Sequence, residues 1–168
     1  NFGIIYGVSA FGLSQQTNLN RKESKILIDS YYENYPTLKE YMSKQIDFAR
    51  ENGYVETLMG RRRYLTNINS QNGMIRSADE RNAVNAPIQG SAADIIKIAM
   101  KNIFNIFNEK QFESKMILQV HDELVFDVHL SELDKIKKVV KNSMESAVTL
   151  DIPLKVDIGT GKNWLEAH

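Results

Sequence analysis

The chain has 168 residues, which is enough for one compact domain with a buried core, and its 21 basic side chains are balanced by 21 acidic ones. This balance argues against a protein that binds nucleic acid through bulk charge, and the absence of cysteine excludes disulfides and thiolate metal sites. No run of about 20 apolar residues occurs, so no membrane-spanning helix is predicted. We expect a cytoplasmic protein. Because it starts at Asn1 without a methionine, we expect a fragment.

The first third of the chain is predicted to be helical. Asn20 followed by Glu23 is the pattern of a helix N-cap with a capping box, and an apolar stripe then continues to Pro36. A second helix is expected from about Pro36 to Glu51, because Gly53 provides the residue type that ends helices.

The middle of the chain is predicted to contain a short strand and two helices. Residues 54–59 favour a strand, and Gly60 favours a turn after it. Residues 74–86 favour a helix, which we expect Pro87 to interrupt because its ring disfavours helix at the preceding residue. A strongly apolar helix is expected to resume after Gly90.

The last third is predicted to contain a β-hairpin followed by a helix. Two apolar β-rich runs, 115–120 and 124–128, flank the polar residues 121–123. Ser131 is expected to cap the last helix, and residues 154–158 are expected to form a short strand. The pattern indicates an α+β fold that is rich in helix and has a small antiparallel sheet.

The hairpin tip carries the sharpest chemical signal. Asp122 and Glu123 are adjacent carboxylates that lie between two strands of buried character. Mg²⁺ prefers oxygen ligands and often takes one or two protein carboxylates, which leaves positions for phosphate oxygens. A polar turn that faces water has the same pattern, and the spacing alone does not separate the two interpretations.

Two further constellations are candidates for binding. Phe2 and Tyr6 lie in a glycine-rich aromatic segment, which is also typical of a helix end packed in a core. Arg81, Asn85 and Gln89 are spaced by four residues, so on one helix they form a polar stripe. Such side chains can donate to the minor-groove acceptors that all correct base pairs present, although a solvated helix face is the ordinary interpretation.

Taken together, these segments resemble the family A DNA polymerases. The resemblance rests on residues 1–13, on 80–94 with Glu80-Arg81 and Gln89-Gly90, and on 119–126, all in register. It implies a partial polymerase fold, one contiguous piece of a larger polymerase domain. Residues 1–72 would be part of the nucleotide-binding fingers, and residues 73–168 would be part of the palm with the catalytic hairpin.

The resemblance also implies roles for individual residues. Asp122 would be a metal ligand, with Glu123 beside the metal site and His121 near the primer terminus. Phe2 would lie against the incoming nucleotide and Tyr6 beneath the nascent base pair. The residues implied to contact DNA are Arg81, Asn85 and Gln89. Arg76, a basic side chain before them, is expected to add a phosphate contact.

The implied activity is templated DNA synthesis in replication and repair. The primer 3′ hydroxyl would attack a deoxynucleoside triphosphate, with two Mg²⁺ ions at the site. The implied partners are primer–template DNA, deoxynucleoside triphosphates and the rest of the polymerase chain. The family takes a second aspartate ligand from an earlier motif that nothing here matches, so we expect the fragment alone to be inactive.

Two other classes of function stay open at this point. In a non-catalytic nucleic-acid-binding module, arginines such as Arg61, Arg62 and Arg63 would bind the backbone, and Asp122 would be an ordinary turn residue. In a metal-dependent phosphodiesterase, the three polar residues of the hairpin tip would support strand cleavage instead of synthesis.

Overall fold

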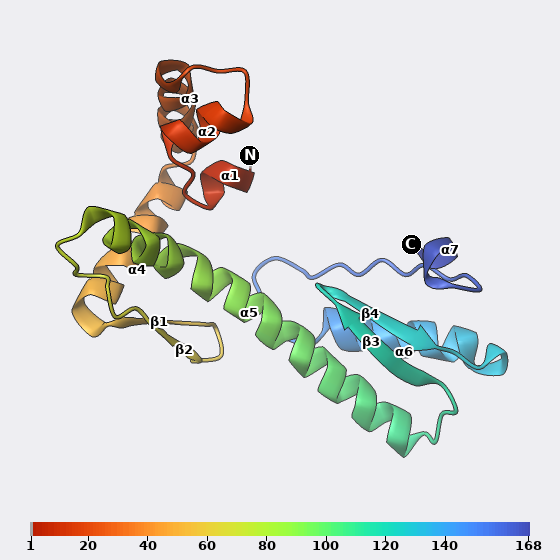
Figure 1. Cartoon of the computed structure of the whole chain (residues 1–168). Coiled ribbons are helices and arrows are strands. Elements are labelled where there is room, and N and C mark those ends of the chain that lie inside the picture. Colours follow the sequence, from red (N-terminus) through yellow and green to blue (C-terminus); the bar gives the residue numbers. More distant parts are fainter. Residues whose placement is uncertain (1) are drawn as a thin grey trace. The chain divides into compact units, whose positions relative to one another are not determined.

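The computed structural model describes residues 2–168, except for the side chain of Phe2. The chain forms two compact units, Asn1–Gly90 and Ser91–His168, and the long helix α5 (Gly73–Glu109) contributes to both (Figure 1). Helices dominate the described residues, and two small antiparallel sheets accompany them. The predicted α+β class is therefore confirmed. None of the described helices is long and apolar enough to cross a membrane.

The first unit begins with the short helix α1 (Phe2–Ile5), which ends in a Schellman motif. The Val8 N–H donates to the Gly3 carbonyl at 2.8 Å, and the Gly7 N–H donates to the Ile4 carbonyl at 3.0 Å. Gly7 has a φ of 76°, which is the left-handed conformation that this motif requires and that glycine adopts without steric cost.

Three helices follow, of which the second and third were predicted from the sequence and the first was not. They are α2 (Ala10–Gln16), α3 (Arg21–Asn34) and α4 (Pro36–Asn52). The predicted capping box at the start of α3 is confirmed, because the Asn20 side chain accepts the N–H of Glu23 while the Glu23 carboxylate accepts the N–H of Asn20. Gly53, with a φ of 77°, ends α4 as predicted.

A hairpin follows α4, and its second strand was not predicted. Strand β1 (Tyr54–Glu56) is shorter than the predicted 54–59, and the arginine cluster forms strand β2 (Arg62–Tyr64). The Arg62 guanidinium lies over the Tyr54 ring, 4.3 Å from its centroid, and donates to the Glu56 carboxylate at 2.7 Å. These cross-strand contacts stabilise the arginine-rich segment as a β-strand.

Helix α5 continues through Pro87, so the predicted interruption is wrong. Pro87 lacks an N–H, which removes the hydrogen bond that would reach the Ala83 carbonyl and costs a free helix about 3 kcal/mol. In this chain Ala83, Val84 and Ala86 are buried at that point. Ala83 and Ala86 belong to a core that also contains Ala49, Val55, Leu65 and Ile68. Burial of this helix face outweighs the local cost of proline.

The second unit is built around a hairpin that packs on two helices. Strands β3 (Lys115–Val120) and β4 (Glu123–Asp127) are antiparallel, and α6 spans Leu133–Glu145. Ile103 and Phe107 of α5 form a buried core with Ile136 and Val140 of α6. The residues packed against this core include Phe112, Leu124, Phe126, Val128, Val139 and Met144.

The predicted cap of α6 is wrong. A short 3₁₀ helix (η1, Leu130–Glu132) precedes α6, and the Ser131 hydroxyl instead lies 2.8 Å from Nδ1 of His129. The cause is Glu132, whose carboxylate accepts the Ser114 hydroxyl at 2.6 Å together with the N–H of Ser114 and of Glu113. These bonds, led by that of the Ser114 hydroxyl, hold the pKa of Glu132 below its usual value.

The predicted strand 154–158 is also wrong. This segment is not a strand in the structure, and the N–H of Val156 donates to the Glu145 carboxylate at 3.1 Å. A β-strand requires a neighbour for its backbone groups, and β3 and β4 pair only with each other among the described residues. The chain then ends in the four-residue helix α7 (Trp164–Ala167), which the Asn163 side chain caps.

Ser24 in α3 offers a test of the packing of the first unit. It is fully buried, and its hydroxyl has no hydrogen-bond partner among the described residues. Ser24→Ala should raise the free energy of unfolding by about 1 kcal/mol, because it removes an unsatisfied buried group. Ser30→Ala, an exposed serine in the same helix, is the control for helix propensity in urea unfolding. An equal gain in both variants would contradict the unpaired hydroxyl.

Gly90 offers a second test. A Cβ there would lie 2.5 Å from Cγ2 of Thr57, a short branched side chain whose hydroxyl accepts two backbone N–H groups. Gly90→Ala should therefore destabilise by about 1–3 kcal/mol, although alanine normally favours a helix interior. In a Thr57→Ser background, which keeps the hydroxyl and removes the methyl group, the same change should become neutral or stabilising. Thermal unfolding measures both, and equal losses in the two backgrounds would contradict the contact.

Candidate functional site

The hairpin of the second unit presents His121 and Asp122 in a two-residue turn. Val120 pairs with Glu123 directly before this turn, so the ladder between the strands continues to the tip. Nε2 of Gln119 donates to the His121 carbonyl at 3.1 Å, and this side-chain hydrogen bond further stabilises the turn. The predicted hairpin is confirmed, and its tip is fixed by backbone pairing.

The backbone of His121 is in an unusual conformation. Its φ is 54°, and Gln111 is the other non-glycine residue with positive φ among the described residues. Positive φ at the first turn residue alone is the pattern of a type II′ turn, in which glycine is the ordinary choice. A histidine here costs roughly 1 kcal/mol relative to glycine. The residue at this position is therefore not the one that would give the most stable turn. Strained backbone conformations of this kind cluster at functional sites.

The two adjacent acids of the tip have different surroundings. The Asp122 side chain is exposed and has no hydrogen-bond or ion-pair partner among the described residues. The Glu123 carboxylate lies 3.2 Å from Nδ1 of His168. In residues 2–168 no three acidic or histidine side chains gather as a complete metal site. The tip thus offers one open carboxylate, a donor that suits Mg²⁺ as part of a ligand set.

In the first unit, the end of α1 lies against α5. Tyr6 follows the last turn of α1, and its side chain is 40% exposed. A Cβ at Gly7 would lie 3.6 Å from Cγ of Arg81, so two segments far apart in sequence meet here. The structure therefore brings Tyr6 and Arg81, two predicted binding residues, into one neighbourhood. The side chain of Phe2, the other predicted nucleotide contact, lies outside the described residues.

The predicted stripe on α5 lies on one unbroken helix. Arg81 and Gln89 are exposed, and Asn85 is half-buried. The Asn85 side-chain oxygen is buried and has no hydrogen-bond partner among the described residues. Because steps of four residues rotate by roughly 400° on a helix, the three side chains share one face.

Arg76 is held inside the first unit. Its Nη1 donates to the Ser70 carbonyl at 2.9 Å, and its Nε lies 3.5 Å from the Glu80 carboxylate. Arg50 reaches the same Glu80 oxygen at 2.8 Å. Arg76 therefore stabilises the loop before α5. This role was not predicted, although Ser70 and Glu80 both lie within six residues of Arg76 in the sequence.

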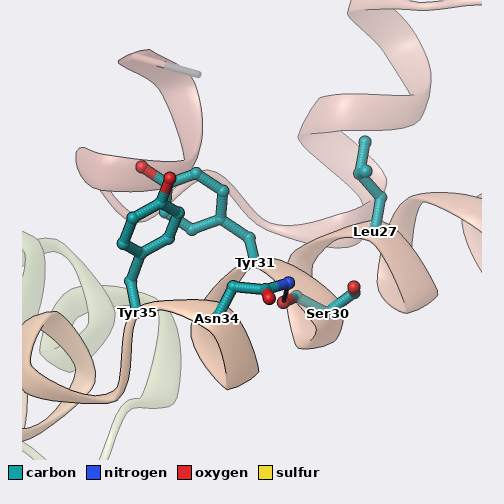
Figure 2. Close-up of a pocket in the computed structure, with 5 residues that line it drawn as sticks. All are labelled: Leu27, Ser30, Tyr31, Asn34 and Tyr35. Carbon is teal, nitrogen blue, oxygen red and sulfur yellow. Dashed lines mark hydrogen bonds between the residues drawn. The ribbon is translucent and has the colours of Figure 1, made fainter.

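A shallow surface hollow lies on one face of α3 (Figure 2). The Tyr31 and Tyr35 rings stand side by side there, with centroids 4.8 Å apart. The residues that line the hollow are Leu27, Ser30, Tyr31, Asn34 and Tyr35. None of them is a predicted site residue, so the hollow adds nothing to the chemistry of the tip or of the stripe.

Comparisons with known proteins place the chain in a family. DNA polymerase family A matches residues 1–166. DNA polymerase I of Lactococcus lactis subsp. lactis is 51% identical over 167 residues, which are 99% of this chain and 19% of that protein. DNA polymerase I of Borreliella burgdorferi is 50% identical over 168 residues, which are 100% of this chain and 18% of that protein.

A solved structure agrees with these relatives. The POL domain of Pol1 from M. smegmatis, in complex with DNA primer-template and dNTP, matches with a TM-score of 0.95 and 43% identity. The match covers 99% of this chain and 29% of that one. The chain spans about a fifth of the length of the curated relatives. The family match over nearly all residues confirms the resemblance, and the chain belongs to DNA polymerase family A.

Proposed function

We propose that the chain is the C-terminal fingers and palm part of a DNA-directed DNA polymerase, which adds deoxynucleotides to a primer 3′ end. Residues 1–72 would belong to the fingers and residues 73–168 to the palm. The observation that carries the proposal is the rigid turn that presents Asp122, in a chain of this family. The M. smegmatis relative was solved with primer–template DNA and dNTP, and we propose the same partners here.

Asp122 is the proposed metal ligand. Its carboxylate is exposed, has no competing cation among the described residues, and lies in a turn that both strands hold in place. The chemistry that two bound Mg²⁺ ions supply is activation of the 3′ hydroxyl and stabilisation of the leaving oxygens. Fixing this carboxylate before the substrates arrive lowers the cost of reorganisation during the reaction.

His121 and Glu123 would support the same tip. His121 is a turn residue with a positive φ. We propose that its side chain lies near the primer terminus. Glu123 belongs to the ladder, and its contact with His168 neutralises part of its charge when that histidine is protonated. Both residues would thus shape the surroundings of Asp122 without ligating the metal.

The first unit would hold the nucleotide and the new base pair. Tyr6, exposed at the end of α1, would lie beneath the nascent pair, and Phe2 would lie against the incoming nucleotide. Arg81, Asn85 and Gln89 share one face of α5, from which their side chains would donate to minor-groove acceptors. Since correct pairs present these acceptors in similar positions, the stripe would test pair geometry without reading sequence.

Asp122→Ala in the full-length parent enzyme should reduce primer extension by roughly 100-fold or more, because a metal ligand is lost while DNA contacts remain. Asp127→Ala is the matched control, since Asp127 is an exposed aspartate at the far end of β4 in the same hairpin. Single-turnover extension and DNA affinity are the measurements. Equal activity in both variants would favour the non-catalytic binding module.

The isolated 168-residue chain should show no Mg²⁺-dependent primer extension. The physical reason is that one open carboxylate does not complete a two-metal site, and the described residues contain no cluster that would. The measurement is extension of a labelled primer by protein purified from a host free of its own polymerase I activity. Detectable extension that depends on Asp122 would contradict the proposed need for the rest of the parent, and strand cleavage would favour the phosphodiesterase.

A further inference from the structure

The loop that joins β1 to β2 forms a closed turn. The Thr57 N–H donates to the Arg61 carbonyl at 3.0 Å, and the Gly60 N–H donates to the Thr57 carbonyl at 2.9 Å. The Thr57 hydroxyl oxygen accepts the N–H of Met59 at 3.3 Å and that of Arg61 at 3.2 Å. Four hydrogen bonds within five residues fix the shape of this loop, residues 57–61.

This loop contacts α5 at Gly90. Nη2 of Arg61 donates to the Gly90 carbonyl at 3.0 Å, across 29 residues of sequence. The Thr57 methyl group occupies the space that a Cβ at Gly90 would need, only 2.5 Å from its position. A carbonyl oxygen has two lone pairs, so the Arg61 bond adds to the helical hydrogen bond of Gly90 without replacing it. Side chains of the loop therefore contact the backbone of α5 directly at Gly90.

The contact lies where α5 is intrinsically weak. Pro87 deprives the helix of one backbone hydrogen bond, and Gly90 is a poor helix former. Gln89, a proposed minor-groove donor, lies between these two residues. A helix with proline and glycine three residues apart bends easily unless outside contacts hold it.

We propose that Arg61 is a positioning residue for Gln89. The loop 57–61 braces α5 at Gly90 and so fixes the direction in which the Gln89 side chain leaves the helix. A minor-groove donor separates correct from incorrect pairs only if it is held still, because the acceptors of a mispair are displaced by small distances. The inference rests on the proposed function of Gln89. It adds that the loop 57–61 is needed for Gln89 to separate correct from incorrect base pairs.

The neighbouring Arg62 does not share this role. Its guanidinium is engaged by Glu56 and by the Tyr54 ring inside the hairpin, so it stabilises the loop's own strands. Arg61 differs because its guanidinium reaches a backbone atom of another element. A simple phosphate contact by Arg61 would weaken DNA binding uniformly and reduce its salt dependence. The brace predicts neither effect.

The test measures kcat/KM for extension from a matched and from a mismatched primer terminus with the full-length parent enzyme. The variants are Arg61→Met, Arg61→Lys, Gln89→Ala and the double variant Arg61→Met/Gln89→Ala. The ratio of the two kcat/KM values is independent of the active fraction, so partial misfolding does not imitate the effect. Arg61→Lys keeps a cationic donor for the Gly90 carbonyl and serves as the conservative variant.

Arg61→Met should lower the matched-to-mismatched ratio by about 3- to 10-fold, the range of one lost hydrogen bond. Gln89→Ala should lower it similarly, the double variant should lose no more than Gln89→Ala alone, and Arg61→Lys should recover part of the ratio. DNA affinity and its salt dependence should stay unchanged in Arg61→Met.

An unchanged ratio in Arg61→Met with a lowered ratio in Gln89→Ala would overturn the brace and leave the proposed function standing. An unchanged ratio in Gln89→Ala would overturn the role of Gln89 and the brace with it. Additive losses in the double variant, or weaker DNA binding with a smaller salt slope in Arg61→Met, would assign Arg61 a contact of its own and also overturn the brace.

Discussion

Pairing of β3 with β4 up to the residues that flank the turn is the constraint on which the catalytic proposal depends. Because Val120 pairs with Glu123, His121 and Asp122 have no freedom to shift along the strands. The hairpin is in turn held by Leu124 and Phe126, which pack against the core of α5 and α6. The packing of the hairpin on this core therefore limits the motion of the side chains at the tip. The same packing compensates for the strained backbone of His121.

The same principle operates in the first unit, where tertiary contacts override local preference. Helix α5 continues through Pro87 because the turn directly before the proline buries Ala83 and Ala86 in the core of the first unit. The consequence bears on the proposed function, since one unbroken helix places Arg81 and Gln89 on a common face. A break at Pro87 would have separated them. The core that keeps α5 continuous thus also keeps the polar stripe aligned.

Local signals were the part of the fold that the sequence predicted well. The capping box at Asn20, the helix stop at Gly53 and the hairpin around residues 121–123 each depend on neighbours within a few residues. The errors at Pro87 and Ser131 arose where partners distant in sequence decide the conformation, as Glu132 does by binding the backbone at Ser114. The resemblance pointed to the candidate site, whereas the distant contacts around it became visible only in the folded chain.

Counting the metal ions bound at the reaction centre tests the central claim most directly. The complex would contain the full-length parent enzyme, DNA with a dideoxy-terminated primer and a matched nucleotide, with Mn²⁺ as the probe metal for paramagnetic titration. Two bound Mn²⁺ ions per complex are expected in the parent, and a loss of Mn²⁺ binding is expected in Asp122→Ala, with DNA still bound. Equal Mn²⁺ binding in both proteins would contradict Asp122 as a metal ligand and leave it as a turn residue.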